Sequence, residues 1–334
     1  MTRRSALFGS ALAAAALGGR NPAAAQQAAT VINTQVVPLA PNVYAYLQRE
    51  APGQSNLSVS NCGMIVGPDS TLVIDTTGGP LHARKFLAAI KTLGKPTDRV
   101  VITHEHPDHI VGLPQFPAHI DIIAQENTRA QLLKPTAAPQ PVYWNSAWAE
   151  PGERLQIVLP TVTFRDRMTL YYGDLQVDLV FPGRAHSEGD AMVVIPRHKI
   201  IFLGDIAFFG VTPLNGSGYV ADWIKVCDRL LADPDVVTIV PGHGPVGGKA
   251  ELADMKGYLE LMWTEGRKRY DAGMSPGRAA ADIKLGRYAT WTDVDRIANN
   301  MARLYSEFKG NIGPDTDRAA IAQSLVDYNA AKGR

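Results

Sequence analysis

The stretch Thr103-His104-Glu105-His106-Pro107-Asp108-His109 brings three imidazoles and the carboxylate of Asp108 within six residues of one another. Histidine and aspartate are ligands that zinc accepts. In an extended chain alternate residues point to the same side, so His104 and His106 can hold one ion. Pro107 then turns the chain, and Asp108 and His109 can face a second ion beside the first. We therefore predict a metal-binding sequence here and not a histidine-rich surface loop.

Three further side chains of the same chemistry follow along the chain. They are His186 in Arg-Ala-His-Ser-Glu-Gly-Asp, Asp205 in Leu-Gly-Asp and His243 in Pro-Gly-His-Gly. Together with Asp75, which follows an apolar run, these motifs make the chain resemble the metallo-β-lactamase superfamily of hydrolases over roughly residues 36–250. The resemblance implies an α/β fold, the four-layer αβ/βα sandwich of that superfamily. It also implies a first metal held by His104, His106 and His186, a second held by Asp108, His109 and His243, and Asp205 as a bridge between the two.

Short apolar runs bounded by turn residues predict strands before most of these motifs. Functional residues that sit where strands end are typical of α/β proteins. A helix is expected at about residues 81–93. The expected strands are residues 36–47 (broken at Pro41-Asn42), 62–66, 71–74, 99–103, 120–124, 177–181, 191–195, 199–203 and 236–240.

After residue 250 the hydrophobic pattern becomes helical, so we expect a catalytic domain at residues 26–250 and a C-terminal helical extension at 251–334. Ser275-Pro276 is typical of a helix start. The apolar stripe from Val294 to Phe308 predicts a helix with Thr292 as its cap. That stripe is expected to pack on its own domain, with a homodimer interface as the alternative.

The N-terminus has the pattern of an export signal. Arg3 and Arg4 precede an apolar stretch that is too short to span a bilayer, and Ala23-Ala24-Ala25 offers a cleavage site. We expect residues 1–25 to be a signal peptide, read by the Tat route or by the Sec route, which makes the protein periplasmic or secreted. An uncleaved anchor is the alternative; after signal removal no stable membrane insertion is expected.

Charge argues against nucleic acid as a partner. Residues 1–25 contain three arginines and no acidic residue, so their loss changes the formal net charge from +1 to −2. Nucleic-acid binding needs a basic surface. We expect instead a small-molecule substrate.

Two zinc ions per chain, with iron or manganese as alternatives, would give a hydroxide at neutral pH that attacks an ester, lactone, thioester or amide. Asp108 is expected to be catalytic as well as a ligand, because its carboxylate can orient the nucleophile. The resemblance implies that a bridging Asp205 favours the thioesterase, lactonase and esterase group over true β-lactamases, and it points to an exported, SoxH-like or quinoprotein-associated branch. The alternatives are a β-lactamase, an iron-dependent oxidoreductase of the persulfide dioxygenase kind, and a non-catalytic accessory protein.

Other residues carry weaker expectations. The resemblance implies that Asp75 supports a ligand, a partner that imidazole ligands need, with a turn residue at the strand end as the alternative; whether Asp190 supports a ligand is left open. The thiols of Cys62 and Cys227 are expected to be buried and free. The remaining histidines, His82, His119 and His198, are expected to be solvated and not to be ligands.

Aromatic residues near the motifs suggest an apolar or aromatic substrate. Tyr219 is a candidate catalytic residue that would donate a hydrogen bond to an oxyanion, with core packing as the alternative. The other candidate substrate contacts are Tyr143, Trp144, Trp148, Phe208 and Phe209. The first three lie in a long Pro-rich segment of the kind that is usually functional or disordered.

Overall fold

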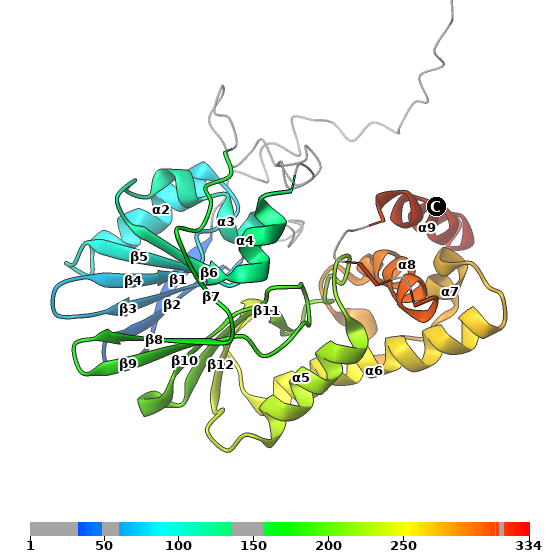
Figure 1. The fold of residues 1–334 in the computed structure, drawn as a ribbon. Helices are drawn as coiled ribbons and strands as arrows, with labels where there is room; N and C mark the ends of the chain where they lie inside the picture. Colours follow the sequence, from blue (N-terminus) through cyan, green and yellow to red (C-terminus); the bar gives the residue numbers. More distant parts are fainter. Residues whose placement is uncertain (1–32, 49–59, 135–155, 311, 314–316) are drawn as a thin grey trace, which may run out of the picture.

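The computed structural model describes residues 33–48, 60–134, 156–310, 312–313 and 317–334 (Figure 1). The predicted signal peptide and the substrate-contact candidates Tyr143, Trp144 and Trp148 lie outside these residues. Within them, the strands form two sheets that lie face to face.

The first sheet has seven strands in sequence order. Neighbouring strands are antiparallel from β1 to β4 and parallel from β4 to β7. Its strands are β1 (Thr34–Ala40), β2 (Val43–Gln48), β3 (Cys62–Val66), β4 (Thr71–Ile74), β5 (Thr97–Ile102), β6 (Asp121–Gln125) and β7 (Val162–Phe164).

The second sheet has five strands in the order β12-β11-β10-β9-β8. Only its β11–β12 pair is parallel. Its strands are β8 (Arg167–Tyr172), β9 (Leu175–Val180), β10 (Met192–Ile195), β11 (Ile200–Phe208) and β12 (Thr238–His243).

Helices cover the outer face of each sheet, which gives the predicted four-layer αβ/βα sandwich (Figure 1). Side chains alternate across each sheet, as strand geometry requires. In β5, Val101 points between the sheets, whereas Val100 and Ile102 pack under the helices of the first sheet. Those helices are α2 (Pro80–Lys91), α3 (Pro107–Ile110) and α4 (Glu126–Leu132); α5 (Val220–Ala232) and α6 (Lys249–Asp271) cover the second sheet.

The strand β11 is longer than predicted. The sequence indicated an end at Leu203, but β11 continues to Phe208 and is buried throughout. Gly204 and Asp205 lie inside it, where residues of these types are usually depleted. Its pairing with β12 shifts register around Gly204. The irregularity carries Asp205 out of the hydrophobic layer and into a polar cluster, which a pattern of apolar residues could not predict.

The C-terminal part is helical, as predicted, with α7 (Pro276–Asp282), α8 (Ile297–Phe308) and α9 (Arg318–Ala331). The apolar stripe of α8 packs on its own chain: a Cβ on Gly266 of α6 would lie 2.5 Å from the Met301 side chain. The prediction that Thr292 caps this helix was wrong. Thr292 forms a bridge with Val211, and Asp293 precedes the short 3-10 turn that leads into α8.

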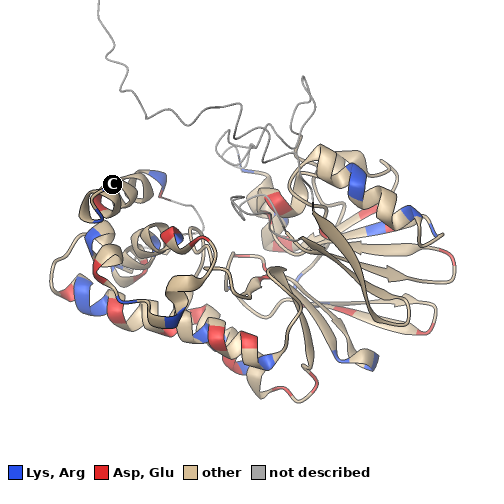
Figure 2. Cartoon of the chain, turned by 180° about the vertical axis from the view of Figure 1, so that it is seen from behind, with Lys and Arg blue, Asp and Glu red and all other residues tan. Residues whose placement is uncertain are grey.

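The exposed side of α6 carries both signs of charge interspersed (Figure 2). Lys256 pairs with Glu260 and Arg267 with Asp271, one helical turn apart. Among the described residues no helix is long and apolar enough to span a membrane.

Buried polar groups in the sandwich correct one prediction and confirm another. His82 is not solvated: its side chain is fully buried on α2, and burial, with repulsion from Lys85, lowers its pKa to about 3. His119 is exposed and His198 is half-buried. The thiols of Cys62 and Cys227 are buried and free, as predicted.

A buried carboxylate, Asp178, lies on β9 in the second sheet. It accepts hydrogen bonds from Arg167 (2.6 Å), Thr169 (2.6 Å) and Gln176 (2.9 Å). Burial by itself would raise the pKa of Asp178, but the three donors outweigh burial and hold the pKa below its usual value.

Candidate metal centre

The structure brings all seven predicted ligand residues together where β5 and β12 end, beside Asp205 inside β11. They form two groups that share Asp205, and within each group the ligand atoms lie within 4.8 Å of one another. The groups are His104, His106, His186 and Asp205, and Asp108, His109, Asp205 and His243. This is a cluster of histidine and aspartate side chains that can bind metal; the role of each residue as a ligand stays a prediction.

Each carboxylate oxygen of Asp205 points toward the histidines of one group. Its Oδ2 lies 3.2 Å from His186 Nε2 and 3.8 Å from His104 Nε2. Its Oδ1 lies 3.1 Å from His109 Nε2 and 3.3 Å from His243 Nε2. A single carboxylate between two histidine groups is the arrangement that a bridge between two cations requires.

The local sequence explains how the 104–109 cluster divides between the two groups. His106 is extended (φ −69°, ψ 147°), and Pro107 begins α3 directly after it. Proline suits the first position of a helix because its φ is already helical and it lacks the N–H group. His104 and His106 therefore lie on the extended arm, whereas Asp108 and His109 lie in the helical turn.

At Gly242 the backbone of β12 passes close to Asp205, and this brings His243 into the second group. A Cβ at this position would lie 2.0 Å from Asp205 Oδ1 and 2.7 Å from the Gly204 carbonyl carbon. Only glycine allows β12 to pass so near Asp205 before it presents His243.

Asp75 has the supporting contacts that the sequence predicted. It follows β4 in the left-handed region (φ 58°). Its carboxylate accepts hydrogen bonds from the backbone N–H and the hydroxyl of Thr103, and it lies 2.8 Å from His109 Nδ1. The Nδ1–H of His109 can then donate to Asp75, which leaves Nε2 to face Asp205.

The open question about Asp190 is answered by its contacts. Its carboxylate accepts hydrogen bonds from the backbone N–H of Ala185 and from both the N–H and the hydroxyl of Ser187. Burial outweighs these hydrogen bonds, which by themselves would lower the pKa of Asp190, and raises it to about 6. Asp190 thus holds the turn on either side of His186.

Sequence reasoning missed two residues that hold the centre in place. Asn61 donates from its amide to the carbonyls of Pro241 (2.9 Å) and Gly244 (2.8 Å), and so holds the turn around His243. Ser217 lies 3.0 Å from His106 Nε2 through its hydroxyl. Neither belongs to a recognisable motif, because one polar residue before a strand or in a glycine-rich turn is common in loops.

Burial and mutual charge set the protonation of the cluster. Burial, together with repulsion from His109, lowers the pKa of His104 well below its usual range, and burial lowers that of His186 to about 3. Burial would raise the pKa of Asp205, but His243, His109 and His186 outweigh it and hold the pKa well below the usual range. The first group therefore offers neutral imidazoles beside an ionised carboxylate, the forms that bind metal.

Unpaired atoms at the centre test whether a metal fits. Buried polar atoms nearly always have a hydrogen-bond partner. Among the described residues, His104 Nε2, His109 Nε2 and Asp205 Oδ1 are buried without a hydrogen bond of normal geometry. All three atoms belong to residues of the two groups, and a donor set of nitrogen and oxygen atoms of this kind fits divalent zinc.

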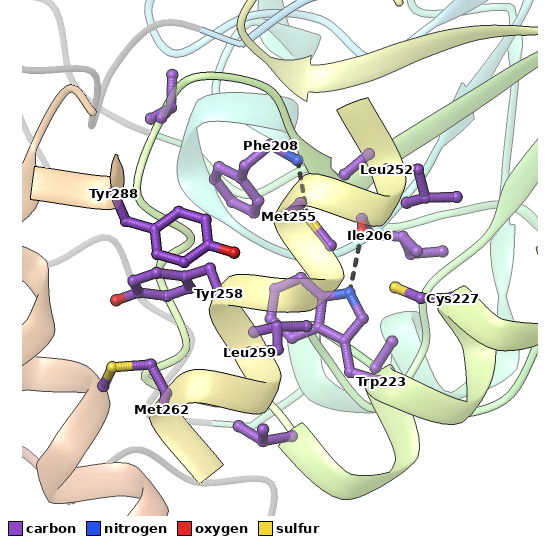
Figure 3. Packing of buried hydrophobic residues seen from close by; sticks show 14 of the residues in the cluster. Ile206, Phe208, Trp223, Cys227, Leu252, Met255, Tyr258, Leu259, Met262 and Tyr288 are labelled. Atoms are coloured by element: carbon purple, nitrogen blue, oxygen red, sulfur yellow. Dashed lines mark hydrogen bonds between the residues drawn. The ribbon is translucent and has the colours of Figure 1, made fainter. Parts of the chain in front are cut away.

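Aromatic side chains from the second sheet and α5 pack against the ligand rings. Phe208 stacks on His243, with ring centroids 5.0 Å apart, and Trp223 meets His186 edge-on at 5.4 Å. Trp223 is fixed in turn by a hydrogen bond to the Ile206 carbonyl (Figure 3). Phe208 and Phe209 were candidate substrate contacts; both are buried, and Phe208 packs against the rings of His186 and His243.

Tyr219 lies at the start of α5 with its ring buried. Its hydroxyl donates to Glu188 Oε2 at 2.7 Å, and the guanidinium groups of Arg184 and Arg303 lie 4.3 and 5.1 Å from its ring centroid. Burial and Glu188 raise its pKa. The hydroxyl is thus engaged by Glu188 in this structure, and its predicted catalytic role stays a prediction.

Comparison with known proteins establishes the family. The family model of the metallo-β-lactamase superfamily matches residues 56–243, which is more than half of the chain. The chain belongs to the metallo-β-lactamase superfamily.

The relatives differ in what their names say they do. The chain is 23% identical to the 2,4-dinitroanisole O-demethylase subunit alpha of Nocardioides sp. (strain JS1661), over 76% of this chain and 68% of that protein. It is 24% identical to the linear primary-alkylsulfatase of Pseudomonas sp. (strain ATCC 19151), over 66% of this chain but only 49% of the sulfatase. It is 26% identical to the metallo-β-lactamase type 2 of Bacillus sp. (strain 170), over 58% of this chain and 71% of that enzyme.

A solved structure shows the same fold. The metallo-β-lactamase from Pontibacter korlensis superposes with a TM-score of 0.56 at 22% identity. The match covers 68% of this chain and 99% of that one. The sandwich is therefore shared along the whole of the smaller protein.

Proposed function

We propose that this protein is an exported hydrolase that binds two zinc ions and cleaves a small ester, lactone, thioester or amide. The observation that carries the proposal is the pair of ligand groups on either side of Asp205, each with its ligand atoms within 4.8 Å of one another. Export rests on the sequence of residues 1–25, and membership of an exported, SoxH-like branch is part of the same proposal.

Bound zinc would supply Lewis acidity and lower the pKa of a water molecule toward about 7. The residues of the chain would then orient that water and move its proton. Asp108 is suited to this because its side chain is 12% exposed, against 5% for Asp205 and 2% for Asp75, so it is the most exposed of these three carboxylates. Asp108 Oδ2 lies 3.1 Å from His243 Nε2, within the group that would hold the second ion.

A bridging Asp205 would favour esters, lactones and thioesters over β-lactams, since the superfamily resemblance associates this bridge with thioesterases, lactonases and esterases. Another relative, the acyl-coenzyme A thioesterase MBLAC2 of Gallus gallus, is 26% identical over 58% of this chain. The names of the other relatives add alkyl sulfates, aryl methyl ethers and β-lactams to the compounds worth assaying.

The test is a turnover screen on zinc-loaded protein against these classes, with metal content and oxygen uptake measured on the same sample. We expect two zinc ions per chain, hydrolysis of an acyl substrate and no oxygen uptake. Bound iron with oxygen uptake would favour the dioxygenase alternative. Zinc-loaded protein that hydrolyses no compound of the panel would favour an accessory protein.

A further inference from the structure

One face of α8, continued into the 3-10 turn that precedes it, is polar and buried. Arg296, Asn300, Arg303 and Glu307 follow one another at spacings of four, three and four residues, so they share a single helical face. None of the four is more than 8% exposed. Buried charges of this kind must be paired or hydrogen-bonded to be tolerated.

All four side chains bond to the main chain of one segment, residues 212–221, which joins β11 to α5. Seven hydrogen bonds make this contact. At one end of the segment Arg296 and Asn300 donate to the carbonyls of Thr212 and Pro213. At the other end Glu307 accepts from the first two N–H groups of α5, at 3.0 Å each. In Figure 1, α8 lies beside α6 and α7, away from the sheets.

The middle of the segment, at Ser217 and Gly218, connects Arg303 to the metal centre. Arg303 donates from Nε to the Gly218 carbonyl (2.8 Å) and from its terminal nitrogen to the Ser217 carbonyl (3.2 Å). The Ser217 hydroxyl lies 3.0 Å from His106 Nε2 and 3.5 Å from the His186 carbonyl oxygen. A serine hydroxyl whose hydrogen points to that carbonyl can only accept from His106.

The direction of this hydrogen bond sets which nitrogen of His106 is available to a metal ion. If Nε2–H donates to Ser217, the lone pair is on Nδ1, and Nδ1 lies 2.7 Å from His186 Nε2 inside the first group. A partner of this kind fixes the tautomer and the ring orientation of a ligand. Arginine is suited to the position of Arg303 because its rigid fork of donors reaches two carbonyls at once, which lysine cannot do.

We propose that Arg303 is a positioning residue for the metal centre, which acts through Ser217 on the ring of His106. The inference rests on the proposed metal centre. It gives α8, a C-terminal helix, a role in orienting one ligand of that centre. It concerns binding of the ion by the group that contains His106, and so it is tested without turnover.

The test is a titration of the metal-free, full-length protein with Co²⁺, followed by visible absorption and by competition with a chelator. The variants are Ser217→Ala, Arg303→Gln and the double variant. The control is Ser324→Ala, which removes a buried hydrogen bond that a hydroxyl of α9 donates to the Ala298 carbonyl of α8 and not to residues 212–221. If Arg303→Gln fails to fold, Arg303→Lys replaces it in the same comparison.

We expect one of the two Co²⁺ binding steps to weaken about 10-fold or more in both single variants, because the loss of such a partner typically lowers metal affinity 10–100-fold. The double variant should be no weaker than the weaker single variant, and Ser324→Ala should bind as wild type does. Losses that multiply in the double variant, unchanged binding in Arg303→Gln, or an equal loss in Ser324→Ala would overturn the proposal. A wild-type protein that binds Co²⁺ but hydrolyses nothing would refute the proposed function and leave this inference standing.

Discussion

Replacement of Gly242 by alanine is expected to damage the metal centre through the position of one carboxylate. The added Cβ would lie 2.0 Å from Asp205 Oδ1, whereas Cβ atoms essentially never come within 3.0 Å of another heavy atom. Either the carboxylate or the strand must therefore move by at least about 1 Å. A shift of that size at a catalytic centre can reduce the rate about 100-fold. The crowding should also lower the free energy of unfolding by about 1–3 kcal/mol.

The assay measures zinc affinity and kcat/KM on the best substrate of the screen, with thermal unfolding alongside. Gly94→Ala is the matched control. Gly94 has φ 79° with no atom within 4 Å of an added Cβ, so alanine there adds left-handed strain of about 1–2 kcal/mol without touching the centre. We expect a loss of stability in both variants and a loss of zinc affinity and rate in Gly242→Ala alone. Wild-type zinc affinity and rate in a folded Gly242→Ala protein would refute the reasoning about Asp205.

Four further substitutions test other residues of the centre and of the sandwich. Asp75→Asn should weaken zinc binding about 10–100-fold in chelator competition, because an amide nitrogen cannot accept the hydrogen bonds of the carboxylate. An unchanged zinc affinity would contradict the role of Asp75 in holding His109. Asp108→Asn should lower kcat about 10²–10⁴-fold in zinc-saturated, folded protein, and a wild-type rate would remove Asp108 from proton transfer. His119→Ala should leave zinc content unchanged, since the side chain is exposed and lies outside both ligand groups. Asp178→Asn should lower the free energy of unfolding by about 1–3 kcal/mol. Because the folded pKa of Asp178 lies below its unfolded value of about 3.9, its contribution is complete above that value and is lost as the pH falls through the folded pKa. The difference between wild type and variant in urea unfolding should therefore shrink as the pH falls below about 4, and a difference that grows would contradict the assigned shift.

The sandwich and the ligand groups were predictable because their signals are local and repeated. Apolar runs bounded by turn residues predicted every described strand except β7 and β8, and histidines and aspartates near strand ends marked the centre. Strand geometry alone separated His104 and His106 from Asp108 and His109, and the structure places them in different groups. The family resemblance supplied the remaining assignment of His186, Asp205 and His243.

The supporting residues were not predictable, because their roles depend on contacts between distant segments. Ser217 is one hydroxyl in a glycine-rich turn, and its partner His106 lies 111 residues away. The polar face of α8 has the pattern of a solvated helix surface, and only the fold shows that Asn300 and Arg303 are buried against another segment. His82 was misjudged for the same reason, since a polar residue on a helix gives no sign of which face meets the sheet.

The most direct test of the account is the position of the metal ions in crystals of the zinc-loaded protein, located by anomalous scattering at the zinc edge. We expect two ions about 3.5–4 Å apart, with one oxygen of Asp205 on each, and His186 and His243 on different ions. Ions bound elsewhere, a single ion, or none in fully loaded protein would contradict the two-metal centre and the hydrolase proposed from it.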